Sequence, residues 1–328
     1  MKTIFIGIDI SKDTLDVAVQ EKPGEKPVDA FVVENSVDGI RKMVKRVKKL
    51  NHEAWYCFEH TGNYGYLLCH QLSAIEQKYS VVPGIEISRS QGLVRGKTDA
   101  VDAVRIANYA CTHQHKLEEF KLQSEQLRKI KEMLSYRNQK SRILRQYKNS
   151  LKSHKITGKI LENDFIIRDI ESSIEMLKKN IADIEAMIMR LIKQDESLSV
   201  NFSKVKSVIG IGPIIAAYLI VYTNNFTSFD NPRKFNSYSG IAPFEYSSGT
   251  SIRGKTRTSK YRNKVIKSLL FNGANAAANY DPELRAYYKR KKEEGKPRQL
   301  IMNNIACKLV YRAFAVVKRD ELFVKLVR

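Results

Sequence analysis

The stretch TIFIGIDISKDTLDVAVQ occupies residues 3–20 and decides how the first third of the chain folds. Two short apolar runs rich in β-branched residues, 3–10 and 15–20, flank the polar segment 11–14. Runs of this kind on either side of a polar turn predict two paired strands. Asp9 lies inside the first run. Burying a carboxylate in such a strand costs several kcal/mol unless the carboxylate is paired or bound to a metal. The stretch therefore predicts a buried strand in which one acid, Asp9, is paired or binds a metal.

The rest of the first third alternates between strand and helix patterns. A third strand is predicted at 29–35, and helix and strand patterns then take turns along the chain. The later predicted elements are helices at 36–50, 64–77 and 99–113 and strands at 53–62 and 79–84. Ser36 opens the first of these helices as an N-cap. This order predicts a mixed sheet with helices on its faces.

A regular spacing of apolar residues marks the middle of the chain. Residues spaced 3, 4, 3, 4, 3, 4 and 3 apart form a heptad seam: Ile167, Ile170, Ile174, Leu177, Ile181, Ile184, Ile188 and Leu191. This period is typical of a coiled coil, although an ordinary helical bundle core also accommodates it. The candidate antiparallel partner, before a turn at 154–159, consists of Leu127, Ile130, Leu134, Leu144, Tyr147 and Leu151. The pattern leaves open whether the seam pairs within one chain or between chains.

Two further patterns follow residue 200. The stretch VKSVIGIGPIIAAYLI (205–220) places Gly210 and Gly212 between two helix patterns. This is typical of a helix-hairpin-helix, whose backbone N–H groups hold a phosphate, and equally of a tight turn that packs two helices. The stretch 235–263 is rich in Ser, Gly and Arg, and we expect it to be a long irregular segment. Long ordered loops are usually functional. Helices are predicted from there to residue 328.

The composition bounds the partners of the chain. Its 328 residues suffice for two domains and a connector. Lys+Arg 57 against Asp+Glu 35 give a formal net charge of +22, which indicates a polyanionic partner such as nucleic acid. We expect no membrane segment, because no apolar run approaches ~18 residues, and no signal peptide, because the N-terminus turns polar early. The four scattered cysteines form no CxxC pair, which predicts a reduced, intracellular protein without zinc sites or disulfides.

Four acids occupy positions from which they can converge. Asp9 lies in the first strand, Glu59 ends a later strand, and Asp99 and Asp102 lie three residues apart at the start of a helix. Taken alone, the last pair also fits a solvated helix face. Together the four match the layout of a ribonuclease H-like site, in which carboxylates from strands and a helix bind Mg²⁺. Lys97, beside the pair, is expected to contact a phosphate.

Five motifs occur in the order found in a known family: GIDISKDTLDVAV, EHTGNYG, GKTDAVDAVRIA, VIGIGPIIA and YSGIAPFEYSSGTSIRGKTRTSKYRN. Over nearly its whole length the chain resembles the insertion-sequence-110 family of transposases. The resemblance implies an α/β plus α fold. Its parts are a ribonuclease H-like (RuvC-like) metal-binding domain at 1–118, a coiled-coil connector at 119–200 and a mainly helical transposase domain at 201–328. It also implies a DEDD tetrad, in the order Asp, Glu, Asp and Asp, which falls on the four acids named above.

The resemblance adds a catalytic serine in the C-terminal domain. It falls on Ser248, with Ser247 as a close alternative, although Ser-Gly pairs commonly form ordinary turns. A serine ester to a DNA phosphate conserves bond energy, so strands can be rejoined without ATP. The cations that follow are expected to contact the phosphate backbone, unless they form a solvated basic loop: Arg253, Lys255, Arg257, Lys260 and Arg262.

Cofactors and partners are also implied by the resemblance. Members of the family are similar in using Mg²⁺, for which Mn²⁺ is a substitute, and in acting on donor and target DNA. A noncoding bridge RNA pairs with both DNAs, so that base pairing carries the sequence information. Homodimers join into homotetramers, and one active site combines the acids of one subunit with the serine of another. The implied location is the prokaryotic cytoplasm, at the nucleoid during the reaction.

Other functions fit parts of the sequence. A Piv-type DNA invertase has the same chemistry without a mobile element. A metal-only, RuvC-like junction nuclease uses the acids and leaves Ser248 structural. A further alternative is a non-enzymatic nucleic-acid-binding protein with a degenerate ribonuclease H-like fold. The presence of all four acids argues against it, because such a protein does not need them. An actin-like sugar kinase shares the first hairpin, but the expected later Gly-rich segments are missing and its substrates do not explain a charge of +22.

Overall fold

The sheet near the N-terminus is built on the hairpin of β1 (Thr3–Ile10) and β2 (Thr14–Gln20). β2 also pairs antiparallel with β3 (Asp29–Glu34). On the other side of β1, β4 (Glu53–Glu59) and then β5 (Lys78–Val82) are added in parallel. The resulting strand order is β3-β2-β1-β4-β5. The mixed sheet predicted from the sequence is confirmed.

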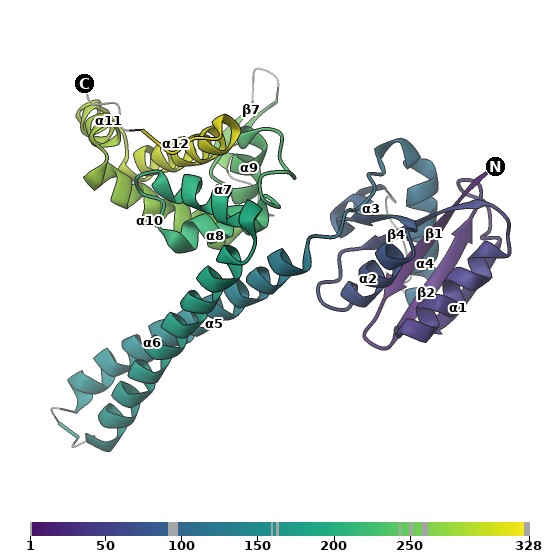
Figure 1. Cartoon of the computed structure of the whole chain (residues 1–328), viewed down its shortest axis with the longest axis horizontal. Coiled ribbons are helices and arrows are strands. Elements are labelled where there is room, and N and C mark those ends of the chain that lie inside the picture. Colours follow the sequence, from purple (N-terminus) through teal and green to yellow (C-terminus); the bar gives the residue numbers. More distant parts are fainter. Residues whose placement is uncertain are drawn as a thin grey trace. The chain divides into compact units, whose positions relative to one another are not determined.

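In this computed structural model the chain forms two compact units, Met1–Leu122 and Gln123–Arg328. Each unit has its own apolar core. Figure 1 shows that the first unit is built around a sheet and the second mainly from helices. The residues that the structure describes are 2–90, 98–158, 160–161, 164–242, 244–248, 252–257 and 262–324.

Helices cover both faces of the sheet. On one face, α1 (Val37–Lys48) and α2 (Tyr66–Ala74) bury apolar side chains against alternate residues of β1. On the other face, α4 (Asp99–Thr112) lies against β1 and β2 and contacts the short α3 (Gly84–Ser90). Because side chains alternate between the two faces of a strand, Asp9 of β1 falls on the same face as α4.

α4 comes closest to β1 at Gly7. A Cβ atom at this position would lie 2.2 Å from the carbonyl oxygen of Ala103 and 2.2 Å from the amide nitrogen of Ala107. The absence of a side chain therefore lets the helix lie directly on the strand. Ala18 of β2 continues the same contact with another small residue. This contact sets the distance between Asp9 and the first turn of α4.

Replacing Gly7 by alanine is expected to lower the free energy of unfolding of this unit by about 3 kcal/mol, since backbone atoms must move to admit a methyl group. The fluorescence of Trp55, the single tryptophan of the chain, reports this unfolding in urea. Gly65→Ala is the matched control, because its methyl group would meet only flexible side-chain ends, at 3.1 and 3.4 Å. Equal losses in the two variants would contradict the importance of the close approach at Gly7.

The second unit begins with a helical hairpin. α5 (Glu125–Thr157) and α6 (Asp164–Lys193) lie side by side and antiparallel (Figure 1). Ion pairs with N–O distances of 2.7 Å cross the hairpin at two levels: Lys155–Glu171 and Arg137–Glu185. All eight residues of the heptad seam are buried or half-buried. The two helices thus pair within one chain, and the knobs-into-holes geometry of a coiled coil stays a prediction.

The apolar positions predicted on α5 are buried or half-buried with one exception. Tyr147 is 36% exposed, so this part of the prediction is wrong. The reason is the phase of the repeat, because alternating steps of 3 and 4 from Leu134 pass by position 147. They reach instead positions 137, 141, 144, 148 and 151.

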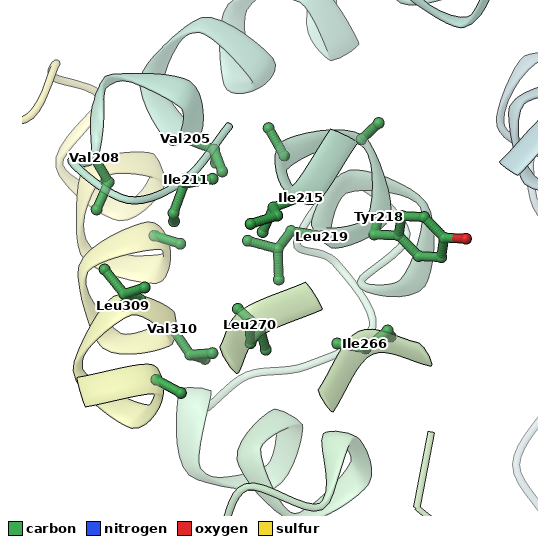
Figure 2. Packing of buried hydrophobic residues seen from close by; sticks show 14 of the residues in the cluster. Val205, Val208, Ile211, Ile215, Tyr218, Leu219, Ile266, Leu270, Leu309 and Val310 are labelled. Carbon is green, nitrogen blue, oxygen red and sulfur yellow. The ribbon is translucent and has the colours of Figure 1, made fainter. Parts of the chain in front are cut away.

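The remaining helices enclose a single apolar core. They are α7 (Glu196–Ser207), α8 (Pro213–Tyr222), α9 (Pro232–Ser239), α10 (Lys264–Tyr280), α11 (Pro282–Glu293) and α12 (Arg298–Arg319). Figure 2 shows how Leu219 of α8, Leu270 of α10 and Leu309 of α12 point into the shared interior. The predicted succession of helices toward the C-terminus is therefore confirmed for the described residues.

Within 235–263 the structure differs from the irregular segment predicted. The segment starts inside α9 and contains an antiparallel hairpin of β6 (Phe244–Ser248) and β7 (Ile252–Arg257). β7 contains a single apolar residue, Ile252, and thus lacks the apolar alternation by which strands are recognised.

α12 is a longer apolar segment than any expected from the sequence. This 22-residue helix has a mean hydropathy of 1.4 in its most apolar window, so by length and composition it is the one described helix that could cross a membrane. Half of that window is buried inside the unit, where Ile305 and Leu309 belong to the core. The expectation missed it because Lys308 and Arg312 interrupt the apolar run.

Candidate active site

The pairing of β1 with β4 brings two of the predicted acids to neighbouring positions. The last paired residues are Ile8 and Phe58, so Asp9 and Glu59 follow side by side at the carboxyl ends of two parallel strands. Asp9 is half-buried and Glu59 is exposed. Since Ile8 and Phe58 both face the core on the opposite side, the two acids lie on the α4 face of the sheet.

The first turn of α4 supplies the other two acids. Thr98 caps this helix, and its side-chain oxygen accepts a hydrogen bond of 3.4 Å from the amide of Val101. Asp99 and Asp102 both lie in this first turn, where the positive end of the helix dipole favours carboxylates. Arg105 donates a hydrogen bond of 2.6 Å to Asp102. The helix terminus thereby offsets part of the repulsion between the two acids.

Asp9, Asp99 and Asp102 act on one another electrostatically. The pKa of Asp9 is raised from 3.8 to about 6 by its burial, then by the charge of Asp102 and then by that of Asp99. A pKa raised in this way means that the negative charges are close and incompletely solvated. The structure therefore brings three of the four predicted acids into one electrostatic cluster.

A fourth carboxylate, Asp16, belongs to the same cluster. It pairs directly with Asp9 across the β1–β2 hairpin, so both side chains lie on one face. Burial and the charge of Asp99 raise the pKa of Asp16. Asp16 is not among the residues predicted for the site. The signal was available in the turn at Ser11–Thr14, since a two-residue loop there sets Asp9 opposite Asp16.

Glu59 lies against a glycine rather than against the three aspartates. A Cβ atom on Gly84 would lie 1.9 Å from Oε1 of Glu59, so the carboxylate occupies the space that a side chain would take. Among the described residues, no three His, Cys, Asp or Glu side chains come close enough together to hold a metal ion. In donor type and charge the acids nevertheless fit Mg²⁺, which prefers hard carboxylate oxygens.

In the second unit, the predicted nucleophile lies in the β6–β7 hairpin. Ser248 is the last residue of β6 and pairs with Ile252, while Ser247 pairs with Arg253. Lys255 and Arg257 belong to β7. Two predicted phosphate contacts, Lys97 and Lys260, lie outside the described residues.

Arg262 is held by packing beside the left-handed end of α9. Gly240 has a φ of 71°, and a Cβ atom there would lie 2.3 Å from Cδ of Arg262. The aliphatic part of the arginine therefore covers the glycine, and its position depends on the absence of a side chain.

The two glycines of the turn between α7 and α8 differ in their surroundings. Gly210 has a φ of 98°, and a Cβ atom there would lie 2.7 Å from the carbonyl oxygen of Gly273 in α10. Gly210 thus allows two backbones to approach closely. Gly212 precedes α8 as its N-cap, and a Cβ atom there would meet nothing within 4 Å.

Comparison with known proteins matches both units. A family model described as "Transposase" matches residues 6–154, and one described as "Transposase IS116/IS110/IS902 family" matches residues 203–289. The chain is 25% identical over 332 residues to the pilin gene-inverting protein of Moraxella bovis, with 99% of each chain covered. It is 31% identical over 160 residues to the insertion element IS110 uncharacterized 43.6 kDa protein of Streptomyces coelicolor, which covers 49% of this chain and 38% of that protein.

An acidic cluster on a mixed sheet, a basic helical unit and these matches define a transposase, an enzyme that recombines DNA. More narrowly, the chain belongs to the IS110 family of transposases.

Proposed function

We propose that this transposase cuts and rejoins DNA strands through a phosphoserine intermediate, with Mg²⁺ bound by Asp9, Glu59, Asp99 and Asp102. The observation that carries the proposal is the cluster of Asp9, Asp99 and Asp102, together with the register that sets Glu59 next to Asp9. Carboxylates crowded between a strand and the first turn of a helix are costly without a cation, which favours a metal-binding role over a solvated surface.

The proposed nucleophile is the hydroxyl of Ser248, with Ser247 as the alternative at the adjacent position. Its Oγ forms a bond to the phosphorus of a DNA strand while the bond from phosphorus to a deoxyribose oxygen breaks, and the departing oxygen takes up a proton. The released hydroxyl of another strand then attacks the phosphoserine, so the serine leaves and the strand is rejoined. Each step exchanges one phosphate ester for another, which explains how the reaction can proceed without ATP.

The acids and the cations have separate roles in this proposal. Bound Mg²⁺ would polarise the phosphate and stabilise the departing oxygen. The four acids position the ion, and Asp16 adds negative charge beside them. Six cations and the backbone of two glycines hold the DNA phosphates in register. The cations are Lys97, Arg253, Lys255, Arg257, Lys260 and Arg262, and the glycines are Gly210 and Gly212. Mn²⁺ is expected to substitute for Mg²⁺ because it accepts the same oxygen ligands.

The finer organisation is proposed from the family resemblance. The sheet unit is a RuvC-like domain, α5 and α6 are a coiled-coil connector, and the remaining helices are the transposase domain. A noncoding bridge RNA selects donor and target DNA by base pairing, which leaves the protein to bind shape and backbone. Homodimers assemble into homotetramers in the cytoplasm, and the acids of one subunit act with the serine of another.

A second candidate function is site-specific DNA inversion. It is favoured by the match to the pilin gene-inverting protein of Moraxella bovis, which extends over 99% of both chains. The strand chemistry is the same in both functions, because inversion also cuts and rejoins four strand ends. The DNA next to the gene separates the two: paired element ends indicate transposition, and an invertible segment indicates inversion.

Trapping of a covalent intermediate tests the proposed chemistry. The full chain is incubated with Mg²⁺, RNA from its own locus and end-labelled donor and target DNA, and the reaction is stopped in denaturant. A labelled adduct is expected that survives a denaturing gel and that, after proteolysis, maps to the peptide containing Ser247 and Ser248. Cleaved DNA without an adduct would contradict a phosphoserine intermediate and support a metal-only nuclease.

Gly84→Ala tests the role of Glu59. The new methyl group must displace the Glu59 carboxylate, which lies at the end of a flexible side chain, so the free energy of unfolding should change by less than about 1 kcal/mol. A misplaced ligand is expected to lower the rate of strand cleavage about a hundredfold. Trp55 fluorescence in urea and single-turnover cleavage measure the two effects. Unchanged cleavage in a stable variant would contradict metal binding by Glu59 at its present position.

A further inference from the structure

α5 differs sharply in charge from the helix beside it. Its 33 residues contain ten Lys and Arg against two Glu, whereas α6 contains five Lys and Arg against six Asp and Glu. Both glutamates of α5 lie near its start, so residues 133–157 contain seven Lys and Arg and no carboxylate. Helix formation does not require this composition, because Glu has as high a helix propensity as Lys.

Polar residues of α5 form a straight row that we call the basic stripe. It consists of Ser135, Asn138, Arg142, Arg145, Asn149 and Lys152. Their spacing of 3, 4, 3, 4 and 3 is the period of the heptad seam on α6. Each stripe residue follows a position of the α5–α6 contact by one residue, so the row keeps a constant angle of about 100° to that contact and flanks it along the hairpin. Five of the six residues are exposed, and Asn138 is half-buried.

The three cations of the basic stripe have no acidic partner among the described residues. Three other cations of α5 do: Arg137 pairs with Glu185 and Lys155 pairs with Glu171 across the hairpin, and Lys129 pairs with Glu125 within the first turns of α5. Beyond its first turns, the ion pairs of α5 are thus made with α6. On the exposed face beside this contact, Arg142, Arg145 and Lys152 carry unneutralised charge over about 15 Å of helix.

We propose that the basic stripe is a docking surface for the phosphate backbone of duplex DNA. Arginine and lysine neutralise phosphates, and the intervening amide and hydroxyl groups donate hydrogen bonds to phosphate oxygens, as in contacts that position a protein without reading sequence. The stripe itself contains no aromatic residue, which argues against single strands, whose bases stack on aromatic rings. The proposal rests on the proposed function only in that DNA is the substrate, and it is independent of Ser248 and of the metal.

The salt dependence of binding tests the proposal without catalysis. The full chain with Arg142→Gln, Arg145→Gln and Lys152→Gln is titrated with a labelled DNA duplex in metal-free buffer at several salt concentrations. Loss of three phosphate contacts should reduce the slope of log K against log salt by about 2.7. Between about 50 and 200 mM salt, the parent should then lose about 40-fold more affinity than the variant. Circular dichroism should show unchanged helix content, because the replaced side chains are exposed.

A matched variant and a photocrosslink complete the test. Arg168→Gln, Lys179→Gln and Arg190→Gln remove the same charge from exposed positions of α6 and should leave the slope nearly unchanged. A photocrosslinking residue at Asn149 should form an adduct with duplex DNA, and one at the exposed Ser172 of α6 should not. Equal slope changes in the two triple variants would overturn the proposal, as would an adduct from position 149 with RNA alone or no adduct at all.

Discussion

Replacing Ser248 by alanine is expected to abolish the covalent protein–DNA adduct and the rejoined product together. Without its hydroxyl, position 248 has no atom that can form the phosphate ester, so no residual adduct should remain. Binding of DNA should persist, because the net charge of +22 is unchanged. The adduct is measured on denaturing gels, and rejoining is measured from the recombinant strand.

Ser247→Ala is the matched control for this experiment. The two serines are adjacent in β6, and each replacement removes one hydroxyl group. If the adduct persists in Ser247→Ala and vanishes in Ser248→Ala, the nucleophile is assigned; the reverse result would move it by one residue. Cleaved ends that are equally abundant in both variants would show that the acids alone cut DNA, and both serines would then be structural.

Replacing Asp9 by asparagine is expected to lower strand cleavage about a thousandfold and at the same time to stabilise the metal-free protein. The loss of activity follows from the removal of a central carboxylate ligand, which is worth several kcal/mol in the transition state. The gain in stability follows from the removal of a half-buried charge that is repelled by Asp102 and Asp99. Activity and stability thus move in opposite directions, as is common at functional sites.

The gain in stability should depend on pH in a defined direction. The pKa of Asp9 is about 6 in the folded chain and 3.8 in the unfolded chain. Between pH 3.8 and about pH 6, Asp9 is therefore protonated in the folded chain and ionised in the unfolded chain. The parent therefore loses stability as pH rises from about 4 through about 6, and the asparagine variant avoids this loss. At pH 7 the variant should be more stable by roughly 1 kcal/mol, after allowance for solvent screening at this half-buried site.

Urea unfolding followed by Trp55 fluorescence measures this difference at pH 4 and pH 7 in the presence of a chelator. Added Mg²⁺ should stabilise the parent and not the variant, which reduces the difference. A variant that is less stable than the parent at pH 7 would contradict the repulsion inferred at Asp9. An unaffected cleavage rate would contradict its role as a metal ligand.

Much of the first unit could be predicted because its residues follow simple periods. The apolar runs rich in β-branched residues in 3–20 predict β1 and β2, and the placement of Ser36 predicts the start of α1. The hairpin of β6 and β7 could not be predicted in this way, because β7 has one apolar residue. The two strands form because β6 and β7 pair with each other, and β7 is not marked by alternating apolar residues in the sequence.

Part of the candidate site could also be predicted from the sequence. Asp9, Asp99 and Asp102 were identified from their positions on a strand and on one face of a helix, and they do lie in one cluster. Asp16 was missed because its closeness to Asp9 depends on the register of a hairpin. The space for the Glu59 carboxylate is provided by Gly84, which lies 25 residues further along the chain. A contact of this kind depends on how strands and loops are assembled, and no local pattern indicates it.

The shared period of the α5–α6 contact and the basic stripe has a consequence for how this hairpin can vary in length. Removing seven residues from each helix shortens the hairpin by about 10 Å and leaves every remaining side chain on its original face. Removing four residues instead breaks the heptad phase, rotates the tip by about 50° relative to the base and changes the local supercoil. The hairpin can therefore take only discrete lengths, which mutation can adjust in whole heptads while the other helices of the second unit keep their fold.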